Sequence, residues 1–426
     1  MSQTDAATEP EFAAFIAIDW ADRKHAWSLQ VAGCSQRESG EIQHTPEAVE
    51  AWVTMLSARF AGQPMAVALE QSQGALVFML GKYGHLHVYP IHPRSAAQFR
   101  AALYPSGAKD DPMDADLLLD LLVLHRSHLR PLRPDTERTR LVRHQVEARR
   151  RLVDEKTRQV QRLTAKLKLY FPQVLDWFDQ VESPLVGALL HRWPTLPELQ
   201  KARPDTIRSF CRRHNCRDAE LIERRIQNIR QAIPAIGDAA VIQPAVTMTR
   251  SLLDLIATLR EGIAKLEQQI AEATAGHPDF PVFDSFPGAG PALAPRLLAA
   301  FGSMREAYTT AADMQKYSGI APVIRRSGKA ESIHFRRACP KFLRQSFHEW
   351  ASHSIAFCDW ARLFYQQKRQ DHDHHAAVRA LAFKWIRIAF RCWQDGVPYD
   401  DARYVDALRR HGSPLAAALN ASDSAS

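Results

Sequence analysis

The chain has 426 residues and 46% hydrophobic side chains, enough for two or three domains with buried cores. No apolar run approaches the roughly 20 residues that cross a bilayer, and the polar residues 1–10 are unlike a secretory signal or a transit peptide, so we expect a cytoplasmic, nucleoid-associated protein with no membrane partner. The net charge of +8 favours a polyanionic partner, most clearly at the basic stretches 126–168 and 322–345.

Residues 11–130 have the pattern of an α/β domain. Strands are predicted from apolar runs and from alternation of apolar with polar residues, at 12–19, 25–31, 41–44, 65–70 and 85–92. Helices are predicted between and after them, starting at Thr45-Pro46-Glu47 and continuing at 74–82, 95–103 and 111–124. The order is three strands, helix, strand, helix, strand, helix, which is the order of an RNase H-like domain.

Residues 131–275 form a predicted helical linker. Apolar residues at helical spacing indicate two long amphipathic helices, at 135–169 and 248–274. These two helices form either a hairpin within the chain or a coiled coil between subunits. The proline-containing stretch 173–245 between them predicts short helices without an assigned function. Residues 276–412 are predicted to be helical with a basic loop, and the small, polar residues 413–426 to be disordered.

Four carboxylates in the first domain stand out by position. Asp19 ends the first strand and Glu70 ends the fourth, and side chains at the strand ends of an open α/β sheet gather at one edge. Asp111 and Asp114 share one face of a predicted helix. If the four meet, their charges repel unless a cation is bound, and carboxylate oxygens suit Mg²⁺ or Mn²⁺. Taken singly, an acid at a strand end is more often a cap or a loop residue, and Asp111 and Asp114 are also consistent with a solvated helix start.

Several of these segments resemble one known family. The sequences at 16–19, 68–70 and 109–115 look like the motifs of the DEDD transposases of the insertion-sequence family one hundred and ten, the bridge-RNA-guided recombinases. The likeness continues at 286–291 and through 317–329. It implies a RuvC-like, RNase H-fold domain with a metal-binding site of four acids, a coiled-coil linker and a C-terminal transposase domain. It also implies donor and target DNA, a structured bridge RNA, and a homo-oligomer, dimeric or tetrameric, with composite active sites.

The C-terminal domain contains two further candidate regions. Gly288 and Gly290 precede the apolar helix 293–301, as in a helix-hairpin-helix element, and would let the backbone approach a phosphate; a plain glycine-rich turn is the alternative. By resemblance, Ser327 attacks the scissile phosphate and forms a covalent phosphoserine. The cations around it would either hold the DNA backbone or form a solvated face, and they are Arg325, Arg326, Lys329, Arg336 and Arg337.

The function predicted is therefore a Mg²⁺-dependent transposase with a serine nucleophile. The first alternative is a RuvC-like junction endonuclease that uses water and forms no covalent intermediate. A sugar-kinase or actin-like ATPase is disfavoured because no glycine-rich phosphate loop follows Asp19, and a non-catalytic nucleic-acid scaffold is the remaining alternative. Two clusters are disfavoured as metal sites, namely Cys211 with His214 and Cys216, and residues 371–375.

Overall fold

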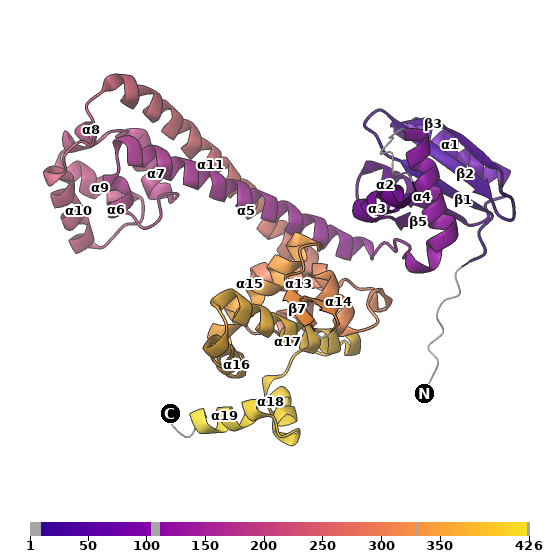
Figure 1. The fold of residues 1–426 in the computed structure, drawn as a ribbon. Coiled ribbons are helices and arrows are strands. Elements are labelled where there is room, and N and C mark those ends of the chain that lie inside the picture. The colour runs from indigo at the N-terminus through magenta and orange to yellow at the C-terminus, as the bar shows by residue number, and fades with distance from the viewer. Residues whose placement is uncertain (1–9, 104–110, 329, 424–426) are drawn as a thin grey trace. The chain divides into compact units, whose positions relative to one another are not determined.

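A computed structural model describes residues 10–103, 111–328 and 330–423, with the side chains of 111, 112 and 420–423 outside the description. The chain forms two compact units, Met1–Pro134 and Asp135–Ser426 (Figure 1). Across these ranges, the helices are all too short or too polar to span a membrane.

The first unit is built on a five-stranded sheet in the order β3-β2-β1-β4-β5. Strands β1, β2 and β3 are antiparallel neighbours, whereas β4 and β5 run parallel to β1. The strands are β1 (Ala14–Asp19), β2 (Lys24–Val31), β3 (Arg37–Gln43), β4 (Met65–Leu69) and β5 (Leu86–Pro90). The helices are α1 (Pro46–Arg59), α2 (Ala75–Leu80), α3 (Pro93–Leu103), α4 (Asp111–His125) and the short 3-10 turn η1 (Arg126–His128). This is the element order predicted from the sequence.

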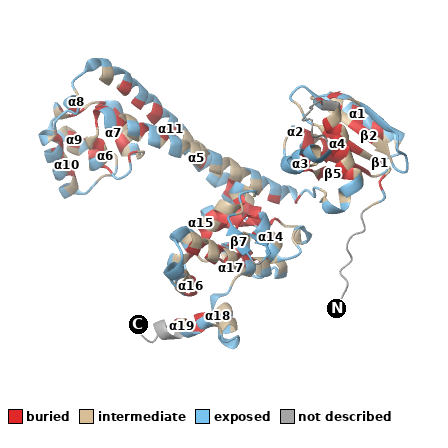
Figure 2. Ribbon diagram, in the orientation of Figure 1, coloured by how far each residue is buried: buried red, intermediate tan, exposed pale blue. Residues whose placement is uncertain are grey.

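The two faces of this sheet bury different side chains. Because side chains alternate along a strand, Ile16 and Ile18 point to one face, where α1 and α2 cover them. Ala17 and Ala68 point to the other face and pack against the leucines of α4. Helix α4 crosses β1, β2 and β4 on this face, and Figure 2 shows the buried residues concentrated in the sheet and α4.

The second unit is organised around two long helices, α5 (Glu137–Tyr170) and α11 (Ala239–Thr274), which pack along each other (Figure 1). Val146 shares a core with Ile270, while Leu163 shares another with Leu252, so the two helices run antiparallel. The long amphipathic helices predicted from the sequence therefore form a hairpin-like pair within the chain. Helix α11 begins nine residues earlier than predicted, since Asp238 caps it.

A cluster of helices packs at each end of this pair. At one end lie five short helices, α6 (Gln173–Trp177), α7 (Pro184–Arg192), α8 (Leu196–Gln200), α9 (Pro204–Arg213) and α10 (Ala219–Gln231). The other end holds the C-terminal core, with α12 (Phe280–Asp284), α13 (Gly290–Phe301), η2 (Arg305–Ala307), α14 (Ala311–Tyr317), α15 (Lys341–Phe357), α16 (Asp359–Asp371), α17 (His374–Asp395), α18 (Asp401–Arg410) and α19 (Pro414–Asp423).

Two segments differ from the sequence prediction. Of the tail predicted to be disordered, Pro414–Asp423 form helix α19, in which Leu415 and Leu419 are buried against the C-terminal core. The predicted basic loop is a two-stranded antiparallel hairpin, β6 (Val323–Ser327) and β7 (Ala330–His334).

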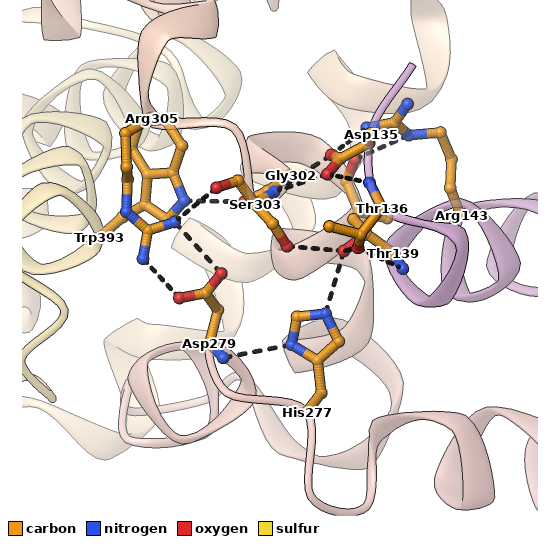
Figure 3. A network of polar contacts seen from close by, with 11 residues as sticks. Asp135, Thr136, Thr139, Arg143, His277, Asp279, Gly302, Ser303, Arg305 and Trp393 are labelled. Atoms are coloured by element: carbon orange, nitrogen blue, oxygen red, sulfur yellow. Dashed lines mark hydrogen bonds and ion pairs between the residues drawn. The ribbon is translucent and has the colours of Figure 1, made fainter.

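A polar network fixes the start of α5 to the C-terminal core (Figure 3). Asp135, which is buried, accepts hydrogen bonds from the backbone N–H groups of Thr136 and Ser303, the latter at 3.1 and 3.2 Å. Gly302 has a positive φ of 73°, and a Cβ atom there would lie 2.2 Å from Asp135 Oδ2, so only glycine fits.

The same network holds a buried neutral histidine. His277 Nδ1 accepts from the backbone N–H of Asp279, so Nε2 carries the proton and donates to Thr139 Oγ1 at 3.0 Å. Burial lowers the pKa of His277, which favours this neutral form. Arg305 pairs with Asp279 and lies over the ring of Trp393, which closes the network.

Candidate active site

Asp19 and Glu70 occupy neighbouring positions at one edge of the sheet. In the parallel pairing of β1 with β4 the last matched residues are Ile18 and Leu69, and the two acids come directly after them. By alternation both acids fall on the face of Ala17 and Ala68, which is the face that α4 covers. Adjacent strands are about 4.8 Å apart, so the two carboxylates can reach one shared ligand.

Helix α4 brings its first turn toward this edge. Asp116 accepts a hydrogen bond from Ser28 at 2.5 Å, and Ser28 pairs with Ala17 in the sheet. One turn later, Asp120 pairs with Arg37, which lies two positions farther from the edge. The helix therefore runs antiparallel to β1, and its N-terminal residues extend toward the end of the strand where Asp19 lies.

Asp114 lies in that first turn and is 6% exposed. Its carboxylate forms an ion pair with Arg100 of α3, a partner that the sequence did not suggest. The backbone of Asp111 begins α4, three residues earlier, but its side chain lies outside the described residues. Among the side chains that are described, no three His, Cys, Asp or Glu residues form a group that could hold a metal.

The donor chemistry of this edge nevertheless fits a hard divalent cation. The acids that face it offer only oxygen ligands, which Mg²⁺ and Mn²⁺ prefer. A guanidinium already neutralises the most buried of them, Asp114, which is what an isolated carboxylate in such a place requires. Asp19 and Glu70 are only partly buried, so this edge is open to solvent and to a substrate.

Ser327 lies at the tip of the exposed β6–β7 hairpin. It pairs with Ala330, and the next residue along the chain, Gly328, has a φ of 57°, the left-handed conformation that tight hairpin turns favour. Ser327 is exposed. Its hydroxyl is thus carried on a projecting strand end, a position from which it can meet a large substrate.

The hairpin has two chemically different faces. Register and alternation place Arg325, Ser327, Ser332 and His334 on one face, with Ser332 hydrogen bonded to His334 at 2.9 Å. The opposite face carries Ile324 and Ile333, together with the ion pair between Arg326 and Glu331 at 2.8 Å. Arg325, which points to the same side as Ser327, is therefore the better placed of the two arginines to contact a phosphate at that serine.

Two family profiles match the chain. Residues 16–172 match the DEDD transposase family of IS110, and residues 281–366 match the transposase family described as IS116/IS110/IS902. The chain belongs to the IS110 family of transposases.

Relatives of this IS110-family transposase match along most of its length. The IS117 mini-circle protein of Streptomyces coelicolor is 27% identical over 93% of this chain and 97% of that protein. The 43.6 kDa protein of insertion element IS110 from the same organism is 26% identical, over 88% of this chain and 92% of that protein. A protein of insertion element IS900 from Mycobacterium paratuberculosis is 25% identical, over 73% of this chain and 77% of that protein.

In this transposase, the matched segments contain the candidate residues of both units. The first segment includes all four acids of the predicted set, and the second includes Gly288, Gly290 and Ser327. Since transposases cut DNA, family membership identifies the chain as a DNA-processing enzyme.

The residues predicted to contact nucleic acid differ in how far their surroundings leave them free to do so. A Cβ on Gly288 would lie 2.8 Å from the backbone of His353 and Ser354, so the glycine is required by packing against α15. Gly290 has open space around it. Arg336 donates to the carbonyl oxygens of Ala321 and Pro322 at 3.2 and 3.4 Å, which ties it to the base of the hairpin. Arg337 is exposed, and Lys329 lies outside the described residues.

Proposed function

We propose that this IS110-family transposase cuts and rejoins DNA with a divalent metal and with Ser327 as nucleophile. The metal would bind at the carboxylate edge, by which we mean the acids at the C-terminal ends of β1 and β4 and in the first turn of α4. The adjacency of Asp19 and Glu70 on the face covered by α4 is the observation that carries the proposal. The five-strand order, with β1 between an antiparallel and a parallel neighbour, supports an RNase H-like classification of the first unit.

Asp19, Glu70 and Asp114 would hold the metal, with Asp111 as the fourth acid. When bound, Mg²⁺ or Mn²⁺ would supply positive charge against the charge that develops on the phosphate oxygens. The acids would position that charge at the end of the strands, where Asp114 is also paired with Arg100.

Ser327 would form the bond to DNA. Its Oγ loses a proton and bonds to the scissile phosphorus, while the bond from phosphorus to a deoxyribose oxygen breaks and that oxygen takes up a proton. The phosphodiester energy is kept in the serine ester, so a second deoxyribose hydroxyl can displace the serine and rejoin the strands. Arg325, on the same hairpin face, would hold the phosphate.

Covalent capture tests the nucleophile. A nicked or suicide DNA substrate is incubated with Mg²⁺ and wild-type protein, Ser327→Ala or Ser332→Ala, and protein–DNA adducts are resolved on a denaturing gel. Ser332 is the matched control because it is a second exposed serine on the same hairpin face. We expect the adduct with wild type and Ser332→Ala only. DNA cleavage without any adduct would instead favour hydrolysis by a metal-dependent endonuclease.

Metal binding tests the carboxylate edge separately. Titration of Mn²⁺ into Glu70→Gln should give an affinity at least about tenfold weaker than wild type, because one charged ligand becomes neutral. Glu47→Gln is the control, since Glu47 is an exposed acid in the first turn of α1. Equal Mn²⁺ affinities of wild type, Glu70→Gln and Glu47→Gln would show that Glu70 does not bind the metal.

We further propose, from the family resemblance, that the protein forms dimers or tetramers in which the acids of one subunit and Ser327 of another act on one phosphate. Mixing inactive Glu70→Gln with inactive Ser327→Ala tests this. If the residues act across subunits, the mixture recovers a fraction of the recombination activity, whereas action within one chain gives none. Guidance by a structured RNA rests on the family resemblance, and sequencing of RNA that copurifies with the protein tests it.

A further inference from the structure

Helices α17 and α18 enclose a groove of about 650 Å³ in the C-terminal core. Basic side chains outnumber acidic ones in its lining, which contains Lys384, Arg387, Arg391, Arg403 and His411 but only two acids, Asp395 and Asp400. The groove is lined entirely by residues after position 383, so it is distinct from the carboxylate edge and from the hairpin of Ser327.

Both acids of the groove already have partners. Asp395 pairs with Arg391 at 2.6 Å. Asp400 caps α18, where its carboxylate accepts from the backbone N–H of Arg403 at 3.0 Å. Within the described part of the chain, Lys384, Arg387 and Arg403 have no ion pair to neutralise them. The groove therefore has an excess of positive charge.

Lys384 is held at the wall of the groove by aromatic rings. Its Nζ atom lies 5.1 Å from the ring centroid of Phe364, 5.8 Å from Trp360 and 6.0 Å from Tyr404. Ring faces attract a cation but leave its charge in place, and burial lowers the pKa of Lys384 because water is partly excluded. A half-buried cation in this setting gains from an anion that enters the groove.

The volume, charge and aromatic lining together indicate the class of ligand. A cavity of this size accepts a group as large as a nucleotide. Cations beside tyrosine rings suit a phosphate followed by a base, the combination found where proteins bind single strands, whose flexible backbone can turn a phosphate into a hollow. We propose that this groove binds a phosphodiester of single-stranded nucleic acid, held by Lys384, Arg387 and Arg403, with Tyr399 and Tyr404 offering surface to an adjacent base.

Fluorescence anisotropy tests the groove with labelled oligouridine and oligodeoxythymidine of about 16 nucleotides. Wild-type protein is compared with the double variant Arg387→Gln/Arg403→Gln, whose two sites are exposed and tolerate exchange. Arg362→Gln is the control, because this exposed arginine of α16 is paired with Asp359. All titrations contain a chelator, so the bound metal does not contribute to the measured affinity. A negative result would therefore count against the groove and not against the proposed metal site.

Loss of two phosphate contacts should weaken binding about tenfold near physiological salt and reduce the slope of log K against log salt by about 1.4. A loss seen only with oligouridine assigns the groove to RNA, and a loss only with oligodeoxythymidine assigns it to DNA. Unchanged affinity and slope for both probes would overturn the proposal. Photocrosslinking of a halogenated oligonucleotide to wild-type protein, with the attached peptide expected within residues 384–411, gives a second readout without a variant.

Discussion

Among single residues, Arg100 and Asp114 form the ion pair with the largest expected effect on metal affinity and on stability. The guanidinium of Arg100 neutralises the buried carboxylate of Asp114, and a metal bound at the proposed site would compete with it for the same acid. Replacing Arg100 with glutamine should therefore raise the affinity for Mn²⁺ about tenfold and destabilise the metal-free protein by about 3 kcal/mol. Calorimetric titration and thermal melting measure the two effects. Arg94→Gln, an exposed site on the same helix, should change neither, and an unaltered Mn²⁺ affinity in the Arg100 variant would argue against this competition.

His25 makes the first unit sensitive to acid. Burial, and next the charge of His44, lower its pKa from 6.5 to about 4. Because the folded pKa lies below the unfolded one, the unfolded chain binds more protons as pH falls, and stability present above pH 6.5 is lost toward pH 4. We expect a loss of about 1.5 kcal/mol between pH 6.5 and pH 5. Thermal melting across this range should show a smaller decline for His25→Gln, while the exposed control His128→Gln follows wild type.

At the scale of elements, the antiparallel pair of α5 and α11 depends on a small residue at its middle. A Cβ on Gly262 would lie 3.1 Å from Leu152 Cδ1, so a larger side chain requires Leu152 to shift within the contact between the helices. Gly262→Val should destabilise the second unit by about 1–3 kcal/mol, measured from the midpoint of chemical denaturation. Valine has a higher helix propensity than glycine, so propensity does not explain a loss at Gly262. Ala264→Val, at an exposed site two residues away, is the control for a β-branched side chain that meets no neighbouring helix. Equal losses in the two variants would show that helix packing is not the cause.

The elements also show what sequence patterns can predict. Strand alternation and acids at strand ends are local signals, so the element order of the first unit and the adjacency of Asp19 and Glu70 followed from them. The hairpin β6–β7 was predicted as a loop because both of its faces are largely exposed and no apolar alternation marks it. Arg100 was missed because its partner lies in another helix, and no spacing rule connects the two.

At the scale of the whole molecule, the boundary between the units falls immediately before Asp135. A protein that starts at Asp135 keeps every group that fixes α5 to the C-terminal core and should melt in one cooperative transition. A protein that starts at Arg140 lacks Asp135 and Thr139 and should lose several °C of melting temperature. Calorimetry of the two fragments makes the comparison, and identical melting temperatures would show that the network contributes little.

The buried carboxylate of Asp135 therefore packs against the backbone of Gly302, which has no side chain to block it. Both residues belong to the second unit and are encoded in the same part of the gene. A second unit that contains both groups of this contact can be inherited, exchanged or fused as a block. Recombination between related elements just upstream of this codon would give chimaeras whose second unit still folds, while the first unit is replaced.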